Sequence, residues 1–242
     1  MITLYRYELK KYFSSLSGLS SLLFFALIQG LFLWIFDSDL NLLDGGYATL
    51  DAFFLLTPWV FIFFIAALCM RSLPEERRNG TLELLRSFPI SEGKIIYAKF
   101  LGILSAVCIC LLLSALYAFS LSQLSMPKGN LDWGALYGSY LGLFLCAMAF
   151  TAIGLFAASL SSHTPAAFFI AVFFNLFLFY GFEGLGSYRL FGSYDYALQQ
   201  IGLYSHYETL SSGVCNLSDV LYFAAVSGLF ISLAQLALKR LP

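Results

Sequence analysis

Long apolar runs separated by short polar segments make up most of this chain. A helix needs about 20 mainly apolar residues to cross the hydrocarbon core of a bilayer. The pattern therefore predicts an all-α integral membrane protein with six transmembrane helices, and we treat residues 1–242 as one transmembrane domain. The predicted spans cover residues 19–36, 52–70, 91–123, 133–160, 166–182 and 220–238.

Composition supports this assignment and excludes several classes of protein. Of the 242 residues, 60% are hydrophobic and 11% are charged, whereas about a quarter of the residues in a soluble domain are charged. No sizeable soluble domain fits between the spans. The net charge of −1 gives no reason to expect a nucleic-acid partner.

Residues 1–17 precede the first span and have the pattern of an amphipathic helix. Such a helix is expected to lie in the membrane interface. A secretory signal peptide is the alternative, but the apolar run at residues 19–36 is long and no small-residue cleavage site follows it, so we expect an anchor. The predicted apolar side carries Ile2, Tyr5, Leu9, Tyr12, Phe13 and Leu16.

Basic residues are distributed very unevenly between the two predicted sides of the membrane. With the amino terminus inside, 11 of the 13 Lys and Arg residues fall on the cytoplasmic side, and only Lys128 and Arg189 lie outside. This bias is what orients polytopic proteins. We therefore expect both termini in the cytoplasm of a bacterial cell, with the protein in the inner membrane.

The polar segments on the outer side differ in character. Residues 37–51 contain four Asp and no Lys or Arg, with Gly45–Gly46 as a turn. Residues 183–219 are rich in glycine and aromatic residues and too apolar for a solvated linker. For this second segment we predict re-entrant or interfacial helices.

Three features inside the spans point to local structure. Thr57–Pro58 predicts a kink in the second span, because proline removes a backbone donor. Small residues at Gly134, Gly138 and Gly142 let another helix approach closely, either within the chain or across a dimer. Asn175 is a candidate for lining a pathway, and an interhelical hydrogen bond is the alternative.

A charged segment interrupts the apolar pattern at residues 74–91, with the sequence P-E-E-R-R-N-G-T-L-E-L-L-R-S-F-P-I-S. Ser72 and Glu75 have the spacing of a capping box, so a short helix is expected from Leu73 or Pro74. Gly80 breaks this helix, and Thr81 is expected to cap a second one. That second helix should carry an apolar side and end before Pro89; its apolar residues are Leu82, Leu85 and, one turn apart, Leu84 and Phe88.

The order of residues in this segment resembles the cytoplasmic signature of the ABC-2 type permease family, the membrane subunits of ATP-driven exporters. The resemblance implies that residues 71–99 form a coupling loop whose helix docks on a separate ATP-binding subunit. By itself, a basic loop of this kind would indicate only topology. The matching positions are Glu75 or Glu76, Gly80, Thr81, Glu83, Leu84, Leu85, Pro89 and Lys99, and we include Arg77 in the expected interface.

A second match lies in residues 205–223, S-H-Y-E-T-L-S-S-G-V-C-N-L-S-D-V-L-Y-F, which resemble the segment before the last span of the same family. Cys215–Asn216 and Ser212 depart from the family pattern there. Residues 30–36, 41–47, 151–156 and 181–185 further resemble the permease of gliding-motility-associated ABC transporters of Bacteroidetes-type bacteria. This resemblance implies a second membrane subunit, either another copy or a protein with an extracytoplasmic domain.

We do not expect this chain to catalyse a reaction by itself. Gly93–Lys94 is followed by Ile95, so the P-loop pattern is missing, and ATP with Mg²⁺ is expected only in a partner. The five cysteines include no CxxC pair, and His163 and His206 fall on opposite predicted sides. We therefore expect no cofactor, metal site or catalytic site, and lipid as the surrounding partner.

Three functional hypotheses remain. The first is a transporter subunit driven by a separate ATPase. The second is a non-transporting membrane scaffold that uses the same docking for mechanical or assembly work in motility or secretion. The third, an intramembrane enzyme or ion-coupled carrier, is disfavoured because the spans contain almost no ionisable groups.

Overall fold

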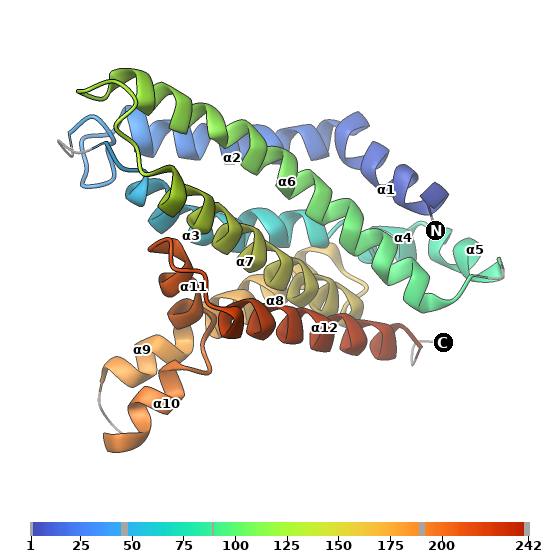
Figure 1. Ribbon diagram of the computed structural model, residues 1–242. Helices are drawn as coiled ribbons and strands as arrows, with labels where there is room; N and C mark the ends of the chain where they lie inside the picture. Colours follow the sequence, from blue (N-terminus) through green and yellow to red (C-terminus); the bar gives the residue numbers. More distant parts are fainter. Residues whose placement is uncertain (1, 45–47, 89, 189–191, 240–242) are drawn as a thin grey trace.

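The computed structural model describes residues 2–44, 48–88, 90–188 and 192–239, and all secondary structure within them is helical. Figure 1 shows an elongated bundle in which α1 begins and α12 ends at the same end, beside α4 and α5. We call this the α4 end. The α11 helix lies at the other end, the α11 end, and α9 and α10 project sideways from the bundle (Figure 1).

Five helical segments are each long and apolar enough to cross a membrane, and a sixth is obtained when α1 and α2, bent by 62°, are counted together. The predicted all-helical fold is thus confirmed for the described residues. The long helices are α2 (Leu16–Trp34), α3 (Asp51–Cys69), α6 (Glu92–Leu124), α7 (Trp133–Leu160), α8 (Thr164–Leu176) and α12 (Leu217–Lys239). A π-helix, η1 (Phe177–Gly181), and α9 (Phe182–Ser187) continue α8.

Helix α7 is the centre of the bundle. It packs against α3, α6, α8, α11 and α12. In its most apolar stretch 78% of the residues are buried, compared with 22% in Thr164–Ser187, which begins with α8, and 22% in α12. Small residues make this close packing possible: a Cβ added to Gly154 would lie 2.7 Å from the sulfur of Cys69 in α3. The poorly covered faces of α8 and α12 are therefore free for lipid or for another chain.

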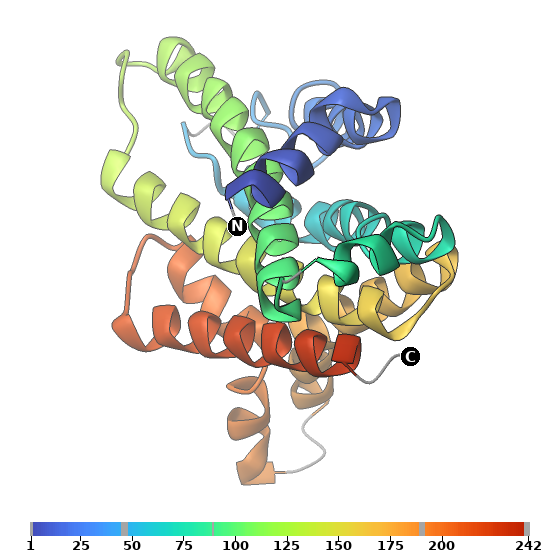
Figure 2. The ribbon, with the colours of Figure 1, turned by 90° about the vertical axis from the view of Figure 1, so that its right-hand side faces the viewer.

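The first helix, α1 (Ile2–Ser14), packs against α6 and α2 and crosses α6 near the α4 end (Figure 2). The predicted apolar face of this segment is partly wrong. Glu8 and Tyr12 are its buried residues, whereas Ile2 is 70% exposed. A charged group at Glu8 thus occupies the packed side, and its partner is described below.

Short helices fill the segment between the last two spans, as expected in outline. They are η2 (Gly192–Tyr194), α10 (Asp195–Gln199) and α11 (Leu203–Ser211). Their depth in a membrane stays a prediction. Gly45–Gly46, Pro89, Arg189 and Arg240, which the sequence interpretation used, lie outside the described residues.

Pro58 lies inside α3, where the missing N–H leaves the carbonyl of Phe54 without its helical donor. The buried hydroxyl of Tyr207 in α11 donates a hydrogen bond to this carbonyl at 2.5 Å. One turn away, Gln29 of α2 donates to the Thr57 hydroxyl at 3.0 Å. The carbonyl left free by the proline is thereby satisfied, and the two hydrogen bonds connect α3 to α11 and to α2. The kink itself stays a prediction.

Candidate functional site

The charged segment forms two short helices at one end of the bundle, α4 (Pro74–Arg78) and α5 (Thr81–Ser87), which we call the α4–α5 segment. Pro74 stands at the start of α4, as expected. The predicted capping box is wrong. The Ser72 hydroxyl donates to the Cys69 carbonyl at 2.7 Å, and no side chain caps α4. Ser72 thus closes the end of α3 instead of starting α4.

Gly80 joins the two helices in a left-handed backbone conformation with φ of 69°. Residues with a Cβ adopt this conformation only at a cost in free energy. The cap predicted at Thr81 is also wrong, because Thr81 lies within α5 and its hydroxyl donates back to the Glu76 carbonyl at 3.3 Å. The bend therefore depends on the backbone freedom of Gly80 and on a bond across the turn.

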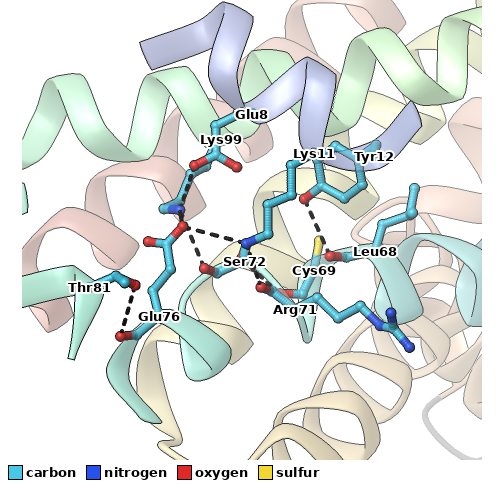
Figure 3. Close-up of polar contacts among 10 residues, drawn as sticks. All are labelled: Glu8, Lys11, Tyr12, Leu68, Cys69, Arg71, Ser72, Glu76, Thr81 and Lys99. Atoms are coloured by element: carbon cyan, nitrogen blue, oxygen red, sulfur yellow. Dashed lines mark hydrogen bonds and ion pairs between the residues drawn. The ribbon is translucent and has the colours of Figure 1, made fainter. Parts of the chain in front are cut away.

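A buried ion cluster connects α4 to α1 and α6 (Figure 3). The ammonium of Lys99 in α6 lies 2.6 Å from Oε1 of Glu76 and 2.7 Å from Oε1 of Glu8. The side chains of Lys99 and Glu8 are fully buried, and that of Glu76 is 6% exposed. The sequence interpretation placed Lys99 at the end of the coupling loop and gave it no partner.

The two lysines of this cluster also donate hydrogen bonds to backbone carbonyl groups after the end of α3. Lys99 donates to the carbonyl of Ser72 at 3.3 Å, while Lys11 of α1 donates to that of Arg71 at 3.2 Å and lies 3.5 Å from Glu76 (Figure 3). Two ammonium groups thus face two carboxylates. Because removing one partner of a buried ion pair leaves an uncompensated charge, the cluster fixes the relative positions of α1, α4 and α6.

The two arginines of the segment bind the ends of other spans. The Arg77 guanidinium donates to the carbonyls of Ser159 and Ser161, at 2.9 and 3.3 Å, where α7 ends. Arg86 donates to the carbonyl of Leu238 in the last turn of α12. The last four carbonyls of a helix lack intrahelical donors, so each arginine satisfies groups that the helix itself cannot.

The α4–α5 segment is therefore bound to α1, α6, α7 and α12 through charged side chains. Its outer face makes no such bond within the described residues: Leu84 is 64% and Phe88 60% exposed, and Arg78 and Glu83 are also exposed. An apolar cavity of about 480 Å³ lies beside this face, between α5 and residues of α1 such as Tyr7. An apolar surface with charged neighbours on a rigid support is suited to bind another protein.

The remaining predicted residues of the segment divide between its two faces. Glu76 is buried in the ion cluster, and Glu75, Arg77, Gly80 and Leu85 are partly buried, whereas Thr81, Glu83 and Leu84 are exposed. Glu76 therefore stabilises the position of α4 from inside the protein, while Glu75 is partly accessible to a binding partner. Sequence reasoning missed Glu8. The signal available was a carboxylate among the apolar positions of an amphipathic helix.

Two of the three predicted packing glycines contact a neighbouring element. A Cβ on Gly138 would lie 2.8 Å from the carbonyl oxygen of Gly213, and one on Gly142 would lie 2.8 Å from the Cβ of Leu210. Gly134 meets only Asp132, the residue that caps α7. The close approach is thus within the chain, between α7 and α11.

Asn175 lies in α8 and is fully buried, and neither its amide nitrogen nor its oxygen has a hydrogen-bond partner in the described part of the chain. Burying an unsatisfied amide is costly. The predicted interhelical hydrogen bond is therefore not formed among the described residues, and the role of Asn175 in a pathway stays a prediction.

Comparison with protein families agrees with this arrangement. Residues 5–239 match the model of the ABC-2 family transporter protein, which covers every helix described above except the first residues of α1. Among proteins with curated descriptions, none matches the chain. A match of this extent leaves only the chain's extreme ends outside the family model, and the chain therefore belongs to the ABC-2 family of transporter proteins.

Proposed function

We propose that this chain is the permease subunit of an ATP-driven exporter and that a separate ATPase subunit docks on the outer face of the α4–α5 segment. Membership of the ABC-2 family implies a membrane subunit and an ATP-binding partner. The observation that carries the docking site is the exposed pair Leu84 and Phe88 on a segment bound to four other helices.

The hydrogen bonds and ion pairs of the segment support a route by which its displacement reaches the spans. ATP and Mg²⁺ bind to the partner chain, whose closure displaces α5. Arg77 carries the displacement to the end of α7, and Arg86 carries it to the end of α12. The Glu76–Lys99 pair carries it to α6. Since α7 is the centre of the bundle, its displacement changes the packing of the whole bundle.

The finer assignment is an exporter linked to gliding motility, in a bacterial inner membrane, with the α4 end in the cytoplasm. It is supported by the sequence resemblance of residues 30–36 and 181–185 and by the excess of basic residues at that end. The sparsely covered faces of α8 and α12 suit a second membrane subunit, as a homodimer or as a heteromer with an extracytoplasmic-domain protein.

Copurification tests the docking site. We would purify the full chain from its native membrane, identify the ATPase by mass spectrometry, and compare Leu84→Arg with Met126→Arg. Met126 is 95% exposed and follows α6 at the opposite end. We expect Leu84→Arg to lose the ATPase and Met126→Arg to retain it. Equal retention by two monodisperse variants would contradict the proposed site.

Transport is tested separately. ATP-dependent movement of a substrate across vesicles containing the reconstituted complex supports an exporter. ATP hydrolysis that depends on this chain, without movement of any cargo found to copurify, would contradict export and support the scaffold hypothesis.

A further inference from the structure

A second concave site lies at the α11 end of the bundle, far from the α4–α5 segment. It is a cavity of about 670 Å³ formed by α3, η1 and α11. Cavities of 300–1,000 Å³ are of the size that holds small organic molecules. The described residues lining it include two carboxylates, Asp51 and Glu208, and six aromatic side chains, which are Phe54, Trp59, Phe179, Tyr180, Tyr204 and Tyr207.

The aromatic side chains form adjoining walls at steep angles. The ring centroids of Trp59 and Tyr180 are 5.2 Å apart with an interplanar angle of 58°, and those of Tyr180 and Tyr204 are 5.7 Å apart at 88°. Phe179, which also lines the cavity, is 1% exposed. Faces of aromatic rings carry negative charge density and attract cations, most strongly alkylated ammonium groups enclosed by several rings.

Phe179 and Tyr180 both belong to η1, the π-helical turn that continues α8. A π-helical turn is rare and occurs frequently at functional sites. Here two consecutive aromatic residues line one cavity. The bond from Tyr207 to the Phe54 carbonyl joins α11 to α3, so the two sides of the cavity are held together before any ligand arrives.

The charge of the cavity is negative. No hydrogen bond or ion pair within the described residues engages the carboxylates of Asp51 and Glu208, and no basic side chain appears among the described lining residues. Burial, followed by the nearby carboxylates of Glu208 and Glu183, raises the pKa of the Tyr204 phenol. The rings and the carboxylates therefore favour the same class of ligand.

We propose that this cavity binds a small organic cation, in which an ammonium group with alkyl substituents lies against Trp59, Tyr180 and Tyr204 and is neutralised by Asp51 and Glu208. A metal ion would not fill the volume, and an anion would be repelled by the two carboxylates. Binding requires no ATPase, so its failure leaves the proposed function untouched, and failure of docking leaves this site untouched.

Fluorescence of Trp59 tests the proposal directly. In full-length protein carrying Trp34→Phe and Trp133→Phe, Trp59 is the single tryptophan. Choline is the probe, and 3,3-dimethylbutan-1-ol, which has the same shape without charge, is the comparison. We expect saturable quenching by choline with an affinity about tenfold above that of the alcohol. Equal affinities, or no saturable quenching by choline, would overturn the proposal.

Charge variants locate the site. We expect Asp51→Asn and Glu208→Gln each to weaken choline binding about fivefold, and Tyr204→Leu to weaken it similarly. Asp37→Asn is the matched control, since this exposed aspartate makes the same charge change outside the cavity. Equal weakening by Asp37→Asn would show a general surface potential and overturn the site. If the tryptophan variants do not fold, equilibrium dialysis of radiolabelled choline against the unmodified chain gives the same comparison.

Discussion

The ammonium of Lys99 in α6 lies 2.6 Å from a carboxylate oxygen of Glu76 in α4, inside the protein and 23 residues away along the chain. Glu8, 91 residues from Lys99, completes the cluster from α1. The ion cluster thus joins three helices that are distant in sequence. It includes a residue of the α4–α5 segment, on which we propose that the ATPase docks.

Replacement of Lys99 by methionine leaves two carboxylates buried beside a single remaining ammonium, that of Lys11. Removing one partner of a buried ion pair costs about 3–5 kcal/mol, and we expect a loss of unfolding free energy in this range. Chemical unfolding in micelles measures it. The triple variant Glu8→Gln, Glu76→Gln, Lys99→Met removes all three charges and should recover most of the loss. A triple variant less stable than Lys99→Met would contradict this account.

Arg77 and Arg78 are adjacent, yet only Arg77 reaches the end of α7, while Arg78 is exposed. Hydrogen bonds to charged groups contribute about 1.5–3 kcal/mol, so we expect Arg77→Gln to lower the unfolding free energy by this amount. Arg78→Gln makes the same charge change and should stay within about 0.5 kcal/mol of the parent. Similar losses in both variants would show that net charge, not the contact with α7, is what matters.

The spans are the part of this structure that a sequence predicts well. The run at residues 133–160 corresponds to α7 at both ends, and the run at residues 220–238 to α12 within a few residues. This follows because the requirement for apolar residues in a bilayer acts on each segment separately. The bend at Gly80 was likewise predictable from its residue type.

Long-range polar contacts were not predictable in this way. Nothing local to Glu8 or Lys99 indicates that the two meet, since their pairing depends on how α1 crosses α6. The expected caps at Ser72 and Thr81 failed for a local reason. Both hydroxyls donate to local backbone carbonyls, that of Ser72 three residues back and that of Thr81 five residues back, and such carbonyls compete with a helix N-terminus for a hydroxyl group.

A substitution at Gly80 causes backbone strain but no steric clash, because a Cβ there would have no atom within 4 Å. The left-handed conformation costs about 1–2 kcal/mol for most residues and less for asparagine. We expect Gly80→Val to reduce stimulation of the copurified ATPase and Gly80→Asn to retain most of it, as measured by phosphate release. Full stimulation with Gly80→Val would show that the bend is not needed for coupling.

The glycines of α7 allow a comparison within one helix. Alanine at Gly138 would place its Cβ 2.8 Å from a backbone oxygen that cannot move freely, whereas alanine at Gly134 meets only the end of the Asp132 side chain at 3.3 Å. Overpacking costs about 1–3 kcal/mol. We expect thermal unfolding to show this loss for Gly138→Ala and little change for Gly134→Ala. The reverse order would contradict the packing of α7 on α11.

Tyr207 and Pro58 make a prediction that only a pair of substitutions can test. Tyr207→Phe removes the donor to the Phe54 carbonyl, and because Pro58 supplies no N–H, that buried oxygen is left unsatisfied. The expected cost is about 1–3 kcal/mol. In a Pro58→Ala background the alanine N–H can bond to Phe54, so the same tyrosine substitution should cost less by about 1 kcal/mol. Unfolding of the four proteins in this cycle gives the coupling energy, and additive effects would mean that Tyr207 stabilises α3 through its ring rather than through the carbonyl that the proline exposes.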